Sequence, residues 1–313
     1  MEKNILGRTK LEVTVAGLGG GGFSRLGIAK FGQDHSAGIV RAAFDNGVNF
    51  FDTATAYGTE GAVGQGLGGI ARDRYVLSTK FPYKNSDGSV KSAQQMEQTL
   101  EQSLKALNTD YVDIYHLHGV HPNDYEKTME VLLPAMRKAK DQGKIRFLGI
   151  TEVFGADTSH AMFQKMFKDN YFDVIMTGYN ILNPSAAKTV LPAAMEKDIG
   201  VLCMFAVRSA LSNPEQLKVD IQRILDKAQA DPALVKDGTA LDFLTESGAA
   251  GSIMEAAYRF TRHTKGINVT LTGTGNPGHL TDNLKSIQMP PLPEKTLEKL
   301  KAMFGKVDCV SGQ

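Results

Sequence analysis

Short apolar runs alternate along the chain with longer segments in which apolar residues recur every three or four positions. Apolar runs of about four to eight residues are typical of strands buried on both faces, and the longer period is typical of helices that pack one face on a core. The pattern predicts strands at residues 13–18, 48–53, 75–80, 112–118, 146–151, 174–177, 200–205 and 268–273.

Helices are expected between these strands. The segment 92–107 shows the pattern well, because Met96, Leu100, Leu104 and Leu107 recur at helical spacing beside polar residues. Other helices are expected at residues 36–46, 124–142, 158–168, 184–198 and 252–265. Eight strands separated by helices predict an α/β fold, the (β/α)8 TIM barrel.

Two segments depart from the alternation. Residues 4–13 place Gly7 and Thr9 in a turn between apolar residues, which predicts an N-terminal β-hairpin that plugs the lower mouth of the barrel. Residues 206–251 follow the seventh strand and contain a helical piece at 214–230 but no strong strand. Long loops at the carboxyl ends of barrel strands are usually functional, so this loop is expected to cover an active site; a solvated insertion is the alternative.

Composition narrows the class of protein. The 313 residues fit one barrel domain, 1–313, and 35 Lys and Arg against 34 Asp and Glu give a net charge of +1. This balance argues against nucleic acid or an anionic membrane as a partner. The only cysteines are Cys203 and Cys309, and no run approaches the roughly 20 apolar residues of a membrane span. We therefore expect a soluble cytoplasmic protein with a small-molecule partner; the oligomeric state stays open.

Four ionisable residues lie at or just after the ends of predicted strands. Asp52, Lys80 and His118 lie at the ends of three such runs, and Tyr57 follows Asp52 by five positions. An ammonium group beside a phenol favours the phenolate and lowers its pKa, and a carboxylate keeps the ammonium charged. His118 supplies a hydrogen bond to the same reacting oxygen. No metal-ligand motif accompanies them, so the set predicts a metal-free proton donor for carbonyl reduction by a hydride-bearing cofactor.

The stretches that carry these residues resemble the aldo-keto reductase superfamily. Residues 49–58 resemble its Asp-to-Tyr motif, 78–80 its lysine strand, 110–118 its histidine strand, and 143–151 the approach to its nicotinamide contacts. The resemblance implies a barrel that binds NADP(H), less often NAD(H), and transfers hydride between nicotinamide and a carbonyl or alcohol. Tyr57 is then the general acid, Lys80 and Asp52 its tuners, and His118 the orienting residue, with His116 as competitor.

The resemblance also implies a set of cofactor contacts, some altered in this chain. Glu152 stands where the family commonly has Asn, Met176 where it has Gln, and Gly273 and His279 at positions that are frequently basic in NADP(H)-preferring members. The expected set is Gly20, Gly21, Thr151, Glu152, Met176, Phe205, Arg208, Gly273, Thr274, Gly275, Asn276, His279, Asp282 and Asn283.

Three of these contacts have specific expected roles. Phe205, or Met204 instead, replaces the aromatic ring that often stacks on nicotinamide. Arg208 is the candidate cation for a ribose 2′-phosphate, with a surface salt bridge as its alternative. Residues 271–283 resemble the adenosine-phosphate loop and the helix after it, where backbone N–H groups favour a phosphate.

The sequence gives fewer indications of the residues that line the substrate pocket. Many members carry Trp after the histidine, whereas this chain has Gly119 and no Trp. Phe23, Tyr83 and His121, with residues 206–251, are expected to line a wider pocket, although ordinary packing is the competing interpretation for both aromatic residues.

Three other hypotheses remain at this point. Residues 17–22 match the spacing of a dinucleotide-binding glycine motif, but residues 23–33 lack the helical pattern that should follow. A lyase would use Lys80 as a Schiff-base nucleophile, which a neighbouring Asp52 disfavours. A non-catalytic nucleotide-sensing barrel would be consistent with Glu152 and Met176.

Overall fold

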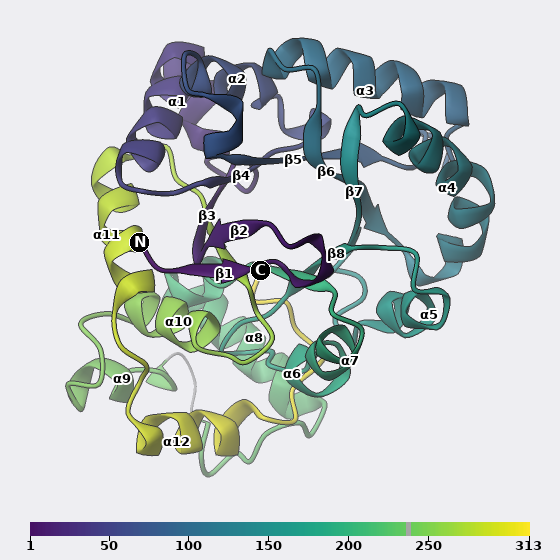
Figure 1. Ribbon diagram of the computed structural model, residues 1–313. Helices are drawn as coiled ribbons and strands as arrows, with labels where there is room; N and C mark the ends of the chain where they lie inside the picture. The colour runs from purple at the N-terminus through teal and green to yellow at the C-terminus, as the bar shows by residue number, and fades with distance from the viewer. Residues whose placement is uncertain (236–238) are drawn as a thin grey trace.

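Eight parallel strands close into a barrel in the computed structural model, which describes residues 1–235 and 239–313 (Figure 1). The strands are β3 (Ala16–Gly19), β4 (Phe50–Asp52), β5 (Val76–Pro82), β6 (Val112–Val120), β7 (Ile145–Glu152), β8 (Val174–Gly178), β9 (Gly200–Met204) and β10 (Val269–Thr272). Each pairs with its sequence neighbours, and β10 closes on β3. The predicted TIM barrel is confirmed.

Helices surround the barrel (Figure 1). They are α1 (Ile28–Asp45), α2 (Glu60–Leu67), α3 (Ala93–Leu107), α4 (Tyr125–Asp141), α5 (Ala161–Asp169), α6 (Ala186–Thr189), α7 (Leu191–Glu196), α8 (Pro214–Asp226), α9 (Phe243–Glu246), α10 (Ile253–Arg262), α11 (Pro277–Gln288) and α12 (Glu294–Phe304). The single helix predicted at 184–198 is wrong, because Pro192 cannot continue a helix and the segment forms α6 and α7 instead.

The glycine-rich helix α2 was not predicted. Its glycines let it pack closely between neighbouring helices: a Cβ on Gly64 would lie 2.6 Å from the backbone of Leu107, and one on Gly66 would lie 2.6 Å from Val40. Glycine weakens a helix in isolation, so only tertiary packing stabilises this one.

The N-terminal hairpin closes the amino end of the barrel, as predicted. β1 (Lys3–Ile5) and β2 (Glu12–Thr14) pair antiparallel and cross the opening in Figure 1. Leu6 and Val13 are fully buried against barrel-interior residues that include Ile114 and Leu202. The predicted strand 13–18 is therefore divided, since its first residues belong to the hairpin and the barrel strand begins at Ala16.

The segment after β9 builds a second apolar core rather than extending into solvent. Leu217, Ile221 and Ile224 of α8 pack with Leu244 of α9 and Phe304 of α12. The chain end joins this layer, because the Ala210 backbone N–H donates to the Gly312 carbonyl at 3.0 Å. Among the described residues of 206–251, Ala206 and Val207 line the cavity described below.

Two observations concern the whole described chain. Cys203 and Cys309 are free thiols, and burial raises the pKa of Cys203. Across residues 1–235 and 239–313, no helix has the length and apolar character needed to span a membrane.

Candidate active site

A cavity of about 350 Å³ opens at the carboxyl ends of the strands. Asp52 and Tyr57 line it at β4, and Met176, Met204 and Phe205 line it from β8 and β9. The wall on the β3 and β10 side is formed by Gly19, Gly21, Gly22, Leu271, Thr272, Gly273 and Thr274, and α11 contributes His279, Asp282 and Asn283. One cavity thus joins the predicted catalytic tyrosine to part of the predicted cofactor set.

A buried ion pair lies beside this cavity. Lys80 Nζ donates to Asp52 Oδ2 at 2.5 Å and to the Thr53 carbonyl at 2.8 Å, and Ser78 Oγ donates to Asp52 Oδ1 at 2.8 Å. Both charged side chains are almost completely shielded from solvent. Asp52 is the last residue of β4 and lies opposite Ser78 of β5. The parallel register of the two strands therefore brings the Asp52, Ser78 and Lys80 side chains together. Burial alone would lower the pKa of Lys80, but Asp52 and Tyr57 together outweigh burial and raise it.

Tyr57 stands on a single 3-10 turn, Thr55–Tyr57, that follows β4. Its phenol oxygen lies 3.1 Å from Nε2 of His118, and the Lys80 ammonium lies 4.9 Å from its ring centroid. Gly21 passes so close that a Cβ there would lie 2.8 Å from the tyrosine ring. The four predicted residues therefore meet at one place, with His118 rather than His116 against the phenol.

The electrostatics of the phenol differ from the sequence-based expectation. Burial raises the pKa of Tyr57, and the Lys80 ammonium opposes burial without overcoming it. Burial and Lys80 together lower the pKa of His118 to about 3, so its imidazole is neutral at pH 7. The predicted lowering of the tyrosine pKa is wrong for this structure, because burial of the phenol outweighs the Lys80 ammonium and the Asp52 carboxylate opposes that ammonium. At neutral pH the site holds a protonated phenol beside a neutral imidazole.

His116 occupies a different position, inside the barrel. It pairs in register with Lys80 and Gly149, and a Cβ on Gly149 would lie 2.2 Å from its ring. Its side chain is fully buried, and burial and Lys80 lower its pKa well below the ordinary value.

We expect His116 to make the protein less stable in acid. The unfolded chain binds a proton on this histidine below pH about 6.5 and the folded chain does not, so stability falls as pH drops through that value. Between pH 7 and pH 5 this group should cost about 2 kcal/mol, which His116→Leu should remove. Urea unfolding of both proteins at the two pH values measures the difference. A stability difference that is the same at both values would contradict this expectation.

Several predicted cofactor residues lie around the β10–α11 connection. Asn276 caps α11, its Oδ1 accepting from the backbone N–H groups of Gly278 at 2.8 Å and His279 at 3.3 Å. Gly273 approaches β3 so closely that a Cβ would lie 2.4 Å from the Gly19 carbonyl oxygen, and Gly275 packs in the same way on Gly27. No side chain, basic or otherwise, fits at either glycine without a movement of the loop.

Other members of the set make contacts within the protein. Gly20 donates its backbone N–H to the Asp52 carbonyl at 2.7 Å, and Thr151 Oγ1 accepts from the Gly119 N–H at 2.7 Å. Arg208 places its guanidinium carbon 3.7 Å from the centroid of the Phe205 ring. Of these residues, Phe205 lines the cavity.

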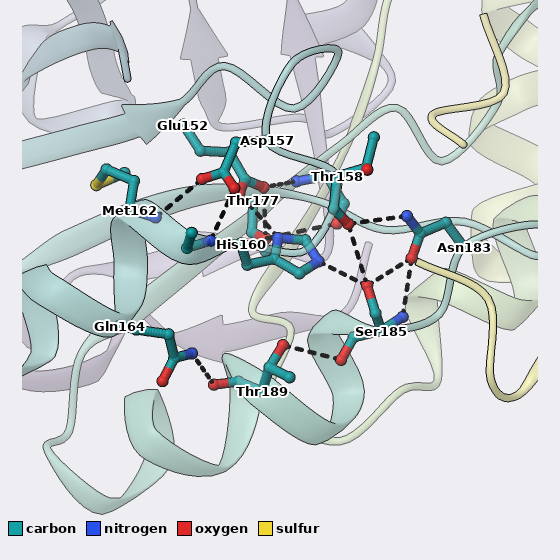
Figure 2. A network of polar contacts seen from close by, with 12 residues as sticks. Glu152, Asp157, Thr158, His160, Met162, Gln164, Thr177, Asn183, Ser185 and Thr189 are labelled. Atoms are coloured by element: carbon teal, nitrogen blue, oxygen red, sulfur yellow. Dashed lines mark hydrogen bonds and ion pairs between the residues drawn. The ribbon is translucent and has the colours of Figure 1, made fainter. Parts of the chain in front are cut away.

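Glu152 corrects our expectation of a cofactor contact. Its Oε1 accepts from Thr177 Oγ1 at 2.9 Å and the Gly178 N–H at 2.7 Å, and its Oε2 lies 2.8 Å from His160 Nδ1. Figure 2 shows this network continuing from His160 to Ser185, whose Oγ lies 3.0 Å from Nε2. Successive strand residues alternate in direction, and Glu152 shares the helix-facing side of β7 with the core residue Ile150. Its carboxylate is therefore engaged away from the cavity.

The three residues predicted for the substrate pocket do not gather at the cavity. Phe23 is 84% exposed on the loop after β3. Tyr83 belongs to the apolar core outside the barrel and donates its hydroxyl to Asp124 at 2.6 Å. His121 Nδ1 accepts from the Asn123 N–H at 3.3 Å. Packing and local capping explain Tyr83 and His121, and Phe23 is displayed to solvent.

Sequence reasoning missed residues that support the site. Ser78 and the Thr53 carbonyl complete the ion pair, and His160 and Phe154 form the layer behind Phe205. Alternation along β5 gave a usable signal for Ser78, because it shares the inward face with Lys80. His160 gave none, since it lies eight residues from Glu152 in an irregular loop.

The barrel with this site defines a class of oxidoreductase, and comparison with known proteins identifies the family. Residues 17–304 match the aldo/keto reductase family. The chain belongs to this family.

Individual relatives support the assignment. The chain is 33% identical over 211 residues to L-galactose dehydrogenase of Arabidopsis thaliana, a match covering 64% of each protein and thus less than two thirds of that enzyme. It is 29% identical to aldo-keto reductase YhdN of Bacillus subtilis, over 90% of this chain and 87% of the relative.

Solved structures share the fold. Aldo-keto reductase AKR11C1 of Bacillus halodurans, in its holo form, superposes with a TM-score of 0.71 at 22% identity, covering 96% of this chain and 95% of that one. An aldo/keto reductase of Klebsiella pneumoniae in complex with NADP and acetate superposes with a TM-score of 0.68 at 20% identity, covering 99% and 98%.

Proposed function

We propose that this protein transfers hydride between a nicotinamide cofactor and an aldehyde, a ketone or the corresponding alcohol, with Tyr57 as general acid and base. The observation that carries the proposal is the position of the Tyr57 phenol at the cavity, 3.1 Å from His118 and above the Lys80–Asp52 pair. The nicotinamide supplies the hydride, and the protein supplies and recovers the proton.

The cavity fits such a cofactor. It extends from Tyr57 to the N-terminal part of α11, a 12-residue helix whose positive dipole end favours an anion. Gly19, Gly21 and Gly22 leave the part of the wall that follows β3 without side chains. Met176 and Phe205 would pack on the nicotinamide end, while Thr274, His279 and Asn283 would contact the adenosine end.

The chain's own groups have distinct tasks in this reaction. The Tyr57 hydroxyl donates its proton to a carbonyl oxygen as that oxygen becomes an alcohol, and accepts it in the reverse direction. The Lys80 charge stabilises the phenolate that forms, and Asp52 keeps Lys80 protonated and directed. Neutral His118 hydrogen-bonds the reacting oxygen and orients it.

NADP(H) is the proposed form of the cofactor, because the Klebsiella relative was solved with NADP. Among the described residues that line the cavity, His279 is the side chain able to carry positive charge, and Asp282 adds a negative one nearby. A phosphate contact in this chain would therefore rely largely on neutral donors, and NAD(H) should be tested beside NADP(H).

The Schiff-base hypothesis is disfavoured by the state of Lys80. Asp52, 2.5 Å from Nζ, raises the lysine pKa, and a protonated amine cannot attack a carbonyl. Borohydride treatment with a carbonyl substrate should leave Lys80 unmodified.

Titration of the protein with NADPH and NADH, followed by a panel of aldehydes, ketones and aldoses, tests the proposal. The panel includes L-galactose because of the Arabidopsis relative. We expect micromolar binding of a reduced cofactor and a decrease in nicotinamide absorbance with at least one carbonyl. Binding without turnover over the whole panel would favour a nucleotide-sensing barrel, and a failure to bind either cofactor would refute the proposal.

A further inference from the structure

Phe205 adopts a backbone conformation that phenylalanine rarely adopts. It follows β9 directly, lines the cavity, and has a φ of 67°, in the left-handed region that a non-glycine residue rarely occupies. Such a backbone persists only where the surroundings fix it. The ring stacks on Phe154, at 6.2 Å between centroids and 22° between planes, and contacts the guanidinium of Arg208.

Phe154, on one side of the Phe205 ring, is itself closely packed. Phe154 is buried, and its ring lies against Gly178 so closely that a Cβ there would be 2.2 Å away. Its ring also stacks on His160 at 5.5 Å and 17°, and His160 is held by Glu152 and Ser185 (Figure 2). The polar network that holds Glu152 away from the cavity therefore supports the ring behind Phe205.

The Arg208 contact is unusual for a phosphate ligand. Its guanidinium carbon lies 3.7 Å from the Phe205 centroid, well inside the range of a cation–π interaction. Its buried Nε has no hydrogen-bond partner among the described residues, and burial lowers its pKa to about 10 although Asp220 opposes this. Its Cβ also packs on the chain end, 3.2 Å from where a Cβ on Gly312 would lie. The side chain is thus committed to an aromatic ring and to packing.

We propose that Arg208 is a positioning residue: it fixes the Phe205 ring at the nicotinamide end of the cavity and is not the ligand of a ribose 2′-phosphate. This inference rests on the proposed use of a nicotinamide cofactor. Arg208 affects cofactor affinity through the Phe205 ring, so its contribution is the same for the phosphorylated and unphosphorylated cofactors.

Four ligands separate the possible roles of Arg208: NADPH, NADH, ADP-ribose and 2′-phospho-ADP-ribose. The last two lack nicotinamide, and the second and third lack the 2′-phosphate. Calorimetric titration of the full chain should show Arg208→Met weakening NADPH and NADH by the same factor, roughly 3- to 10-fold. Both ADP-ribose ligands should bind within about twofold of wild type, which also shows that the rest of the site is folded.

Other patterns overturn the inference. A loss restricted to NADPH and 2′-phospho-ADP-ribose would make Arg208 a 2′-phosphate ligand. Loss for all four ligands would indicate a diphosphate contact or disturbed folding, and no loss would remove any role. If wild type binds none of the four, the proposed function itself fails.

Two further variants sharpen the test. In a double-mutant cycle, Arg208→Met should add little to the loss caused by Phe205→Leu, because both act on the same ring. Additive losses would contradict the coupling. Arg137 provides the matched control, since its guanidinium lies 5.3 Å from the exposed ring of Tyr171, and Arg137→Met should leave all four affinities unchanged.

Discussion

Replacing Tyr57 by phenylalanine is expected to lower the rate of carbonyl reduction at least about 100-fold, with cofactor affinity changed less than about twofold. Proton transfer by a positioned side chain contributes roughly 100- to 10,000-fold to a rate, and the variant removes the phenol beside His118. The ring remains to pack against Gly21 and Lys80, so the cavity keeps its shape. Steady-state kinetics and cofactor titration on the same preparation measure both quantities.

Tyr83→Phe is the matched control. Tyr83 is a buried tyrosine whose hydroxyl donates to Asp124 at 2.6 Å, and it does not line the cavity. Its loss should cost some stability and leave turnover largely intact. Unchanged turnover in Tyr57→Phe would refute the assigned role, whereas equal losses in both variants would point to general destabilisation.

Replacing Lys80 by methionine should have the second large effect, on stability as well as turnover. Removing one partner of a buried ion pair leaves an uncompensated charge and costs about 3–5 kcal/mol. Asp52 would keep the hydrogen bond from the Ser78 hydroxyl, which is neutral and cannot balance its charge. Turnover should also fall, because no cation then stabilises the phenolate of Tyr57. Urea unfolding and kinetics measure the two effects.

The stability lost in Lys80→Met should become smaller as pH falls. Burial already raises the pKa of Asp52 in the folded protein, and without Lys80 the rise should be larger. A carboxyl whose folded pKa is raised holds its proton more tightly when folded, so the stability of Lys80→Met should recover as pH falls from 8 toward 5. A variant whose stability deficit is constant over this range would contradict the ion-pair account.

The double variant Lys80→Met with Asp52→Asn separates structure from chemistry. It removes both charges, so much of the lost stability should return. Turnover should stay low, because the neutral pair cannot stabilise a phenolate. Recovery of turnover together with stability would show that Lys80 is structural only.

The barrel strands could be predicted because the residues within each strand indicate that the strand is buried. A strand buried on both faces needs consecutive apolar residues, and this requirement is met locally, as in 200–205. The proximity of the four predicted site residues was predictable for a related reason. Once the strands are parallel neighbours, Asp52, Lys80 and His118 must end at the same edge, whatever the helices do.

Elements stabilised by distant partners were not predictable in this way. Helix α2 depends on close packing that its glycines permit against Val40 and Leu107. The core beneath residues 206–251 needs α12, which begins at Glu294, and no local pattern couples the two. The helix break at Pro192, by contrast, was visible in the sequence.

By itself, the sequence determined the barrel, the hairpin and the identity of the four residues at the strand ends, because hydrophobic periodicity and strand order are local properties. Only the tertiary structure decided the direction of the Tyr57 pKa, the withdrawal of Glu152 to His160, and the contact of Arg208 with Phe205. Those outcomes depend on how much water and which charges remain around a side chain after folding, and chain segments far apart in sequence set both.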